Sequence, residues 1–437
     1  MSTVTFLPSQ IGGARGNAQP VPIPNTGNPF MLLGSDIVLF FKCKKYLLGI
    51  FSPWYPWPTG PLDELYPSPA NLFCLGVHAF LFFYQLAFIV GVILSFILHA
   101  PLPWFVAGAG LAITINWAIC RYCLNGPRRV LHSTVDLSSW PAHPKEFWIF
   151  LNGVTIGSHW LQQNLNRLAY TFRRPITGVH NTTAGLIFDI VQCLTERNFS
   201  YSTQDIRDGY AQIKAALLDA RYEKVVFILH SQGGIEGGLI VDWLLAEVPQ
   251  DCMRKLEVYT FGCAANHFNN PHQTRGGQRA AEAQANAGER DCGHGSKVIR
   301  HIEHYANDGD LVAQWGLVNF IRVPNRFMGT LLQRRGGGHL LNLHYLHAIF
   351  PLDKKMRVLE NNEFMDAPVR FDPDGVAADE REGEIASLQI AEAEVMNINS
   401  PVDLVSPDSP TNDEGMPRRV RDFSRLWRYR NGGSPRN

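Results

Sequence analysis

The sequence predicts an α/β protein: a mostly parallel sheet with helices on both faces, preceded by a two-helix transmembrane hairpin and followed by a disordered tail. Between residues 140 and 360, short apolar strands alternate with helices, a pattern typical of a parallel sheet covered on both faces. Residues 65–120 contain no Asp, Glu, Lys or Arg, which is typical of membrane-embedded helices. Residues 366–414 carry 13 acidic and two basic side chains, which favours disorder.

The composition excludes several classes of protein. The chain has 437 residues, with 39 Lys and Arg against 39 Asp and Glu, so its formal net charge is zero. A neutral chain has no general attraction to nucleic acid, and no nucleic-acid partner is expected. The eight cysteines are scattered, and Cys120 and Cys123 form a single CxxC without a second ligand pair. We therefore expect no disulfide framework, no metal site and no organic cofactor.

The N-terminal region is expected to hold a disordered segment and then an interfacial one. Residues 1–34 are polar and aperiodic, and no basic stretch leads directly into an apolar run, so no cleavable signal peptide is expected. Ser35 is a candidate cap for a helix over 36–51, in which lysines interrupt apolar residues. The motif SPWYPWP follows, and Trp and Tyr beside Lys suit a water–lipid boundary. Residues 35–70 are thus interpreted as interfacial; the alternative is an amphipathic helix docked on the soluble domain.

Residues 71–121 are predicted to form the hairpin. The apolar runs Leu72–Leu98 and Leu102–Cys120 would be about 40 and 28 Å long as helices, against a hydrocarbon core of about 30 Å. Pro101 and Pro103 interrupt the apolar stretch and place the tip between the two runs. The alternative is a pair of buried helices in a soluble core.

The charges that flank the hairpin predict its orientation. Three lysines precede it, three arginines follow it, and the tip has neither. Since basic residues collect on the cytosolic side, both flanks, the α/β domain and the C-terminus are expected to be cytosolic. The organelle is left open. The flanking basic residues are Lys42, Lys44, Lys45, Arg121, Arg128 and Arg129.

The α/β domain, residues 140–360, is built from strands and helices that alternate along the chain. A polar stretch rich in Gly, Gln and Ala, residues 266–295, interrupts the alternation and is interpreted as a flexible surface insertion. The expected strands are 146–151, 175–179, 224–229, 256–261 and 298–305, and the expected helices are 186–194, 205–220 and 235–248.

The segment KVVFILHSQGGIEGG predicts a nucleophile at Ser231. An apolar strand ends at His230, small residues follow Ser231, and an apolar helix begins after them, which is the strand–Ser–helix arrangement of a nucleophile elbow. The usual pattern is G-x-S-x-G, and here Leu229 replaces the first glycine. Gly237 and Gly238 on the helix are expected to make room for that larger side chain.

A nucleophilic serine needs a histidine base and an acid that orients it, in the chain order Ser, acid, His. The acid is expected in the loop after the strand that ends near residue 305: Asp310 is favoured, and Asp308 is the alternate. Three glycines precede His339 and an apolar helix follows it, so His339 is the favoured base, with His344 as the alternate.

Two backbone N–H groups are candidates for an oxyanion hole. The N–H of Gln232 lies at the start of the helix after the nucleophile, where it faces a developing oxyanion. The strand 146–151 is followed by Asn152-Gly153-Val154, and the N–H of Val154 is the second candidate. The alternative for this segment is a plain turn.

Residues 144–350 resemble the α/β-hydrolase superfamily, in particular lipase-like serine hydrolases. The resemblance is carried by the motifs HSQGG, TFGCAANHFNN and GHLLN, which are similar to those of fungal membrane-associated members. It implies an acyl-enzyme mechanism with Ser231 as nucleophile, His339 as base and Asp310 as acid. Beside a bilayer, the expected substrate is a lipid or another acyl ester. A non-catalytic membrane scaffold on the same fold, and an acyltransferase with the same nucleophile, are the alternatives.

The C-terminal tail, residues 366–437, is expected to be disordered, with an acidic and then a basic part. The basic part, 415–437, holds seven Arg and one Asp, interleaved with aromatic residues. Such a segment suits an anionic lipid surface, or pairing with the acidic tract.

Overall fold

The computed structural model describes most of the chain. The described residues are 3–9, 25, 27–53, 60–271, 273, 297–323, 326–371 and 418–435. Within them the strands form one nine-stranded mixed sheet in the order β2-β4-β3-β5-β6-β7-β8-β1-β9. The strands are β1 (Val4–Leu7), β2 (Val130–His132), β3 (Glu146–Leu151), β4 (Thr177–Val179), β5 (Lys224–His230), β6 (Leu256–Phe261), β7 (His301–Asn307), β8 (Thr330–Arg334) and β9 (Val369–Phe371).

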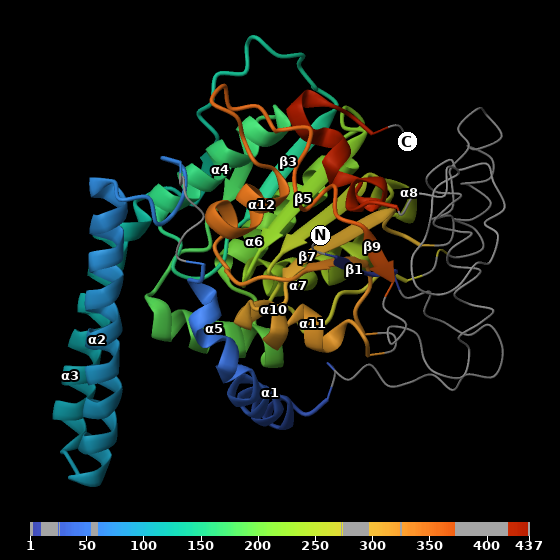
Figure 1. Ribbon diagram of the computed structural model, residues 1–437. Helices are drawn as coiled ribbons and strands as arrows, with labels where there is room; N and C mark the ends of the chain where they lie inside the picture. Colours follow the sequence, from blue (N-terminus) through green and yellow to red (C-terminus); the bar gives the residue numbers. More distant parts are fainter. Residues whose placement is uncertain are drawn as a thin grey trace, which may run out of the picture.

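Helices cover both faces of the sheet, and its centre is parallel from β4 to β8, as predicted (Figure 1). Alternate residues of one strand face opposite layers. Trp148 and Phe150 of β3 pack with α4, η4 and η6, whereas Ile149 and Leu151 pack with α6 and α7. The helices of the α/β domain are α4 (Ser158–Phe172), α5 (Leu186–Phe199), α6 (Gln204–Leu218), α7 (Gly233–Glu247), α8 (Gln250–Met253), α10 (Leu311–Trp315), α11 (Leu317–Phe320), η4 (Leu341–Leu346) and α12 (His347–Ile349).

Two helices, α2 (Pro69–Ile97) and α3 (Leu102–Ile119, continued by η3, Cys120–Asn125), form a hairpin beside the α/β domain (Figure 1). Both are long and apolar enough to cross a membrane. Only 11% and 6% of the residues in their most apolar windows are buried, so this is not a pair of core helices. The described structure therefore leaves a large apolar surface on the hairpin uncovered by protein.

The expectation of disorder for residues 1–34 is wrong at two places. Val4–Leu7 form β1, which pairs antiparallel with β8 and parallel with β9. Helix α1 (Pro29–Cys43) begins at Asn28, whose side chain accepts the N–H groups of Phe30 and Met31, and Ser35 lies inside this helix instead of capping it. A four-residue strand is too short to show a period, and its partners come from the far end of the chain. The 3₁₀ helix η2 (Lys44–Ile50) follows α1.

The polar insertion begins later than expected. Phe268 is fully buried and Asn270 bonds the backbone of Ile299, so the interpretation of a flexible insertion is wrong for residues 266–271. Most of the remaining insertion lies outside the described residues.

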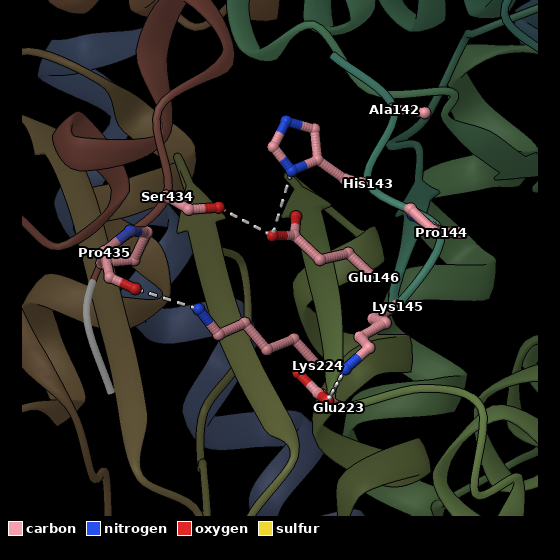
Figure 2. A pocket seen from close by; sticks show the side chains of 9 residues that line it. All are labelled: Ala142, His143, Pro144, Lys145, Glu146, Glu223, Lys224, Ser434 and Pro435. Carbon is pink, nitrogen blue, oxygen red and sulfur yellow. Dashed lines mark hydrogen bonds and ion pairs between the residues drawn. The ribbon is translucent and has the colours of Figure 1, made fainter.

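A pocket of about 400 Å³ lies at the amino ends of β3 and β5, which begin at Glu146 and Lys224 (Figure 2). This is the edge of the sheet opposite to the one on which Ser231 lies. Two of its lining residues, Ser434 and Pro435, belong to the C-terminal segment. The lining residues are Ala142, His143, Pro144, Lys145, Glu146, Glu223, Lys224, Ser434 and Pro435.

The expectation of a disordered basic tail is wrong for residues 418–435. This segment forms α14 (Val420–Phe423) and η6 (Leu426–Gly432) and buries Leu426, Trp427 and Tyr429 against the sheet. The acidic stretch 372–417 lies outside the described residues.

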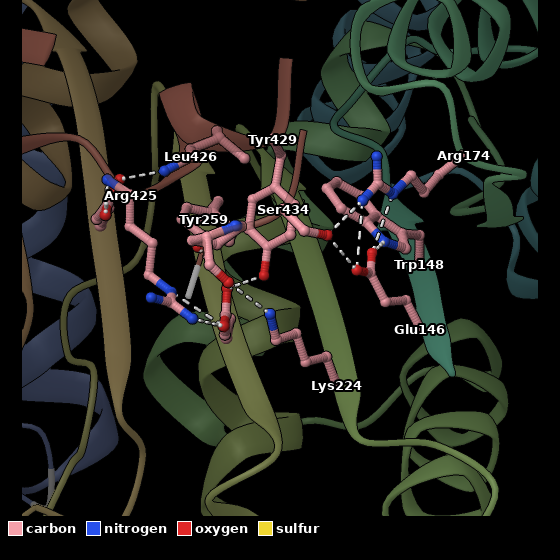
Figure 3. Close-up of polar contacts among 12 residues, drawn as sticks. Glu146, Trp148, Arg174, Lys224, Tyr259, Arg425, Leu426, Tyr429 and Ser434 are labelled. Atoms are coloured by element: carbon pink, nitrogen blue, oxygen red, sulfur yellow. Dashed lines mark hydrogen bonds and ion pairs between the residues drawn. The ribbon is translucent and has the colours of Figure 1, made fainter. Parts of the chain in front are cut away.

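Buried carboxylates of the sheet hold the C-terminal segment in place (Figure 3). Glu257 on β6 accepts hydrogen bonds from the Arg425 guanidinium at 2.8 Å and from the Tyr429 hydroxyl at 2.8 Å. Burial alone would raise the pKa of Glu257, but the Arg425 charge reverses this effect and lowers it. Glu303 on β7 accepts the backbone N–H of Arg425 at 2.7 Å. Because a buried carboxylate without a partner costs several kcal/mol, the basic end is recruited to the protein core.

The segment is expected to contribute to stability through its aromatic core residues. Truncation by Trp427→Ala leaves a cavity beside Phe350 and should lower the free energy of unfolding by about 3–5 kcal/mol. The control Arg428→Ala removes an exposed side chain and should change it by less than about 0.5 kcal/mol. Urea unfolding of the detergent-solubilised full chain measures both, and equal stabilities of the two variants would contradict the prediction.

Candidate active site

Ser231 lies on a sharp turn between β5 and α7. Its φ is 58°, a left-handed conformation that a non-glycine residue adopts only under constraint, and its side chain is held at the carboxyl edge of the sheet. Leu229 fits because Gly237 faces it: a Cβ on Gly237 would lie 2.3 Å from Leu229 Cδ1. The expected role of Gly237 is confirmed, whereas Gly238 faces the carbonyl of His267 instead.

Three residues predicted from the sequence meet at this turn. His339 Nε2 lies 2.8 Å from Ser231 Oγ, and His339 Nδ1 lies 2.8 Å from Asp310 Oδ2. Asp310 follows β7 and caps α10, and His339 lies in the loop after β8. All three side chains are buried, so the imidazole bridges the hydroxyl and the carboxylate away from bulk water. This is the geometry of a nucleophile, base and orienting acid.

The two alternates do not reach Ser231. Asp308 accepts the backbone N–H of Gly336 at 2.8 Å and so shapes the glycine loop before His339. His344 accepts the N–H of Leu340 through Nδ1 and contacts the carbonyl of Pro53 through Nε2. Both side chains therefore support the loop that carries His339.

Two supporting residues were not anticipated from the sequence. Tyr345 donates its hydroxyl to Asp310 Oδ2 at 2.7 Å. His230 lies 2.8 Å from the carbonyl of His339 through Nε2 and stacks on its ring, with centroids 4.8 Å apart. Burial lowers the pKa of His230 to about 3, so it is neutral and its Nε2–H donates to that carbonyl. Tyr345 follows the candidate His344, and His230 precedes the candidate Ser231. The local sequence pattern does not show that the side chains of Tyr345 and His230 point toward the site.

Glycines allow the backbone to approach the three residues closely. A Cβ on Gly153 would lie 2.4 Å from Ser231 Cβ, so the loop after β3 lies directly against the nucleophile. Gly262 has a φ of 55°, and a Cβ there would lie 2.8 Å from Asp310 Oδ2. Within the described residues, neither the Val154 N–H nor the Gln232 N–H donates a hydrogen bond. Gln232 follows Ser231 in the chain, and Val154 follows Gly153, which lies against Ser231; among the described residues neither N–H has a partner.

Buried acids lie behind the oxyanion candidates, and the sequence analysis did not identify them. Glu196 on α5 accepts a hydrogen bond from the Gln232 side chain at 2.9 Å, and burial raises its pKa to about 8. Asp189 accepts the N–H of Thr155, next to Val154, at 2.8 Å, and burial raises its pKa to about 6. The helix α5 thus braces both sides of the candidate oxyanion hole.

The segment 44–53, here called the η2 strap, lies over the His339 loop. The N–H groups of Gly338 and His339 donate to the carbonyls of Gly49 and Ile50, at 2.6 and 2.9 Å. The strap and α1 also pack on an apolar cluster that borders the site. This cluster contains Ile235, Ala264, Leu311 and Trp315, with Leu39, Phe40, Tyr46, Ile50 and Val154 packed against it.

Comparisons with known proteins yield no family: no protein-family model matches the chain, and no curated protein is significantly similar to it. Among the described residues, no group of three or more His, Cys, Asp or Glu side chains is arranged to hold a metal ion. Any activity of the site therefore has to be inferred from the geometry of its side chains.

The raised pKa of Glu196 predicts a pH-dependent stability. Between its usual value of about 4.5 and about 8, the folded protein keeps a proton that the unfolded chain has lost. Folding therefore becomes less favourable as the pH rises through this interval. In Glu196→Gln, the fall in melting temperature from pH 5 to pH 8 should be smaller than in wild type. The exposed Glu223→Gln is the control, and an unchanged fall in Glu196→Gln would refute the prediction.

Proposed function

We propose that this protein is a membrane-anchored serine ester hydrolase of the α/β-hydrolase type, with a lipid or another acyl ester as substrate. The observation that carries the proposal is the position of the His339 imidazole, 2.8 Å from both Ser231 Oγ and Asp310 Oδ2. The free N–H groups of Gln232 and Val154 beside Ser231 add the second element that acyl transfer needs.

The proposed reaction proceeds in two halves. Ser231 Oγ attacks the ester carbonyl while His339 Nε2 takes the hydroxyl proton, and Asp310 holds the imidazole by its Nδ1–H. The N–H groups of Gln232 and Val154 stabilise the tetrahedral oxyanion. His339 then returns the proton to the departing alcohol, which leaves an acyl-enzyme. Water, activated by His339, attacks that ester, and the carboxylic acid leaves as Ser231 recovers its proton.

The surroundings of Ser231 favour an apolar acyl group. The apolar cluster beside the site includes Ile235 and Leu311, with Val154 packed against it. Ile235 lies one helical turn after Ser231, Leu311 follows Asp310, and Val154 is itself an oxyanion candidate. An acyl chain that displaced part of this cluster would remain among aliphatic and aromatic side chains. Burial of each methylene would contribute about 0.8 kcal/mol to binding.

The hairpin supplies the anchor in this proposal. Its outer surface is apolar and exposed, for example at Phe83 and Phe96, which are 67% and 71% exposed. Lipid would cover that surface at no cost in unpaired polar groups, since the helices satisfy their own backbone bonds. The basic flanks favour a cytosolic position for the α/β domain.

Labelling by a fluorophosphonate should depend on Ser231 and His339. Wild type is expected to react, Ser231→Ala to lose labelling completely, and His339→Ala to label at least 100-fold more slowly because the hydroxyl has no base. The measurement is in-gel fluorescence of the full-length protein in detergent. Asp308→Asn is the matched control, because the alternate acid does not contact His339, and it should label within a few-fold of wild type.

Failure of correctly folded wild type to label would refute the serine-hydrolase proposal. Equal loss in Asp308→Asn and in Asp310→Asn would instead refute the assignment of the acid.

Gly153→Ala should impair the site without unfolding the protein. The new methyl group would press on Ser231 Cβ at 2.4 Å, so either the nucleophile or the oxyanion loop must move. We expect a drop of 10-fold or more in labelling rate in a protein that still folds, with its melting temperature lowered because overpacking a buried site costs about 1–3 kcal/mol. Gly60→Ala, whose Cβ would meet nothing closer than 3.9 Å, is the control. Labelling of Gly153→Ala at the wild-type rate would contradict the close approach.

A further inference from the structure

We propose that the α2–α3 hairpin enters only one leaflet of a membrane, with its tip near the bilayer midplane, and that the surface it fits is a single phospholipid monolayer. The inference rests on the membrane anchoring proposed above and specifies its depth. It is carried by the place at which the hairpin is fastened to the α/β domain.

The fastening lies halfway along the hairpin and is polar. Gln85 on α2 donates to Asn116 on α3 at 2.9 Å and to the carbonyl of Ala184 at 2.6 Å, and its oxygen accepts the N–H of Ile187 at 3.0 Å. Asn116 donates to the same Ala184 carbonyl at 2.8 Å. Gln85 is fully buried. The loop of the α/β domain before α5 is thus clamped to the middle of both helices.

The half of the hairpin nearer the flanks lies along the α/β domain. Asn71 accepts hydrogen bonds from His159 and Trp160 of α4, at 3.0 and 2.9 Å. His78 stacks on the ring of Trp160, and Asn125 donates to the carbonyl of Thr183 at 2.8 Å. These polar contacts repeat along one side of the hairpin, so this half remains against the domain.

Beyond the ring contact of Phe88 with Phe188 on α5, the other half projects away from the α/β domain (Figure 1). From residue 86 to residue 115, no residue is buried. This leaves twelve residues of α2 and fourteen of α3, with lengths of about 18 and 21 Å at 1.5 Å per residue. A full hydrocarbon core is about 30 Å thick and one leaflet about half of that. The free half therefore crosses one leaflet with its headgroups, and full crossing would draw the polar clamp and the adjoining domain surface into the hydrocarbon.

The tip is mostly apolar, with His99 as its one polar side chain. Leu98, Leu102 and Trp104 are 74%, 70% and 77% exposed, and residues 98–103 contain no Asp, Glu, Lys or Arg. A loop that emerged on the far side of a bilayer would place these apolar side chains in water, at a cost of about 25 cal/mol per Å² of exposed area.

The adjoining surface of the α/β domain suits the headgroup region. In Figure 1, α1 and α5 lie on the same side of the sheet as the hairpin tip. Helix α5 connects the hairpin to α1, through the ring pairs Phe88–Phe188 and Phe30–Phe199. Both helices carry exposed apolar side chains, and on α1 these lie next to the basic residues at its end and at the start of η2, a combination typical of helices that lie in an interface. The apolar ones include Phe30, Met31, Val38, Phe41 and Val191, and the basic ones are Lys42, Lys44 and Lys45.

The test measures the depth of the tip in a membrane. A single NBD fluorophore is attached to a cysteine at Leu98 in a full chain in which Cys123, Cys252 and Cys292 are replaced by serine. The protein is reconstituted into phosphatidylcholine–phosphatidylserine vesicles. Spin-labelled lipids then quench it from the headgroup, the upper chain or the chain end. We expect the strongest quenching, by at least two-fold over the headgroup label, from the chain-end label at the midplane. The same fluorophore at Leu359, exposed on the α/β domain, is the control and should not be quenched.

A second measurement asks whether one monolayer suffices. Full-length protein is mixed with triolein droplets coated by the same phospholipids and floated through a density gradient. Co-flotation of most of the protein is expected. Strongest quenching at Leu98 by the headgroup label, together with absence from the droplets, would show a transmembrane hairpin and overturn the inference while leaving the anchor intact. No quenching at Leu98 by any label would overturn the anchoring itself.

Discussion

Two hydrogen bonds to one imidazole ring join three segments that are far apart in the chain, and much of the surrounding structure holds that ring. His339 contacts Ser231, 108 residues earlier, and Asp310, 29 residues earlier, because β5 and β7 end at one edge of a parallel sheet. The His230 side chain donates to the backbone carbonyl of His339, and the backbone N–H of His339 donates to the carbonyl of Ile50 in the η2 strap. A histidine held at its ring and at its backbone is preorganised, which is what the proposed reaction would require.

Buried carboxylates divide into two groups with different roles. Glu257 on the sheet finds the Arg425 guanidinium, and that attraction draws the basic end of the chain into the core. Glu196 and Asp189 on α5 lack such a partner; burial raises their pKa values, and neutral or hydrogen-bonded acids of this kind fit a bracing role behind Gln232 and Val154. Charge pairing thus holds the basic end of the chain on the sheet, whereas hydrogen bonds from neutral donors hold the two acids of α5.

Helix α5 and the η2 strap link the proposed membrane-binding surface to the proposed active site. The amino end of α5 is next to the clamp that holds the hairpin, and its Glu196 holds Gln232 beside the nucleophile. The strap follows α1, whose outward face is apolar, and covers the loop of His339. A substrate that arrives from a lipid phase would therefore meet apolar side chains before it reaches the serine. This arrangement explains why the exposed apolar surface adjoins the site.

Local pattern was sufficient wherever a residue's role follows from its neighbours along the chain. Alternation of apolar strands and helices predicted the parallel sheet, and the strand–Ser–helix context and the glycine loop identified Ser231 and His339. The sequence favoured Asp310 over Asp308, and the folded chain shows why the two differ: Asp310 contacts the imidazole, whereas Asp308 accepts the N–H of Gly336. Only tertiary contact could order β1 and the basic end, since their partners lie hundreds of residues away. The attachment of the hairpin to the α/β domain likewise depends on Gln85 and Asn116, two polar residues whose shared partner, the carbonyl of Ala184, no periodicity reveals.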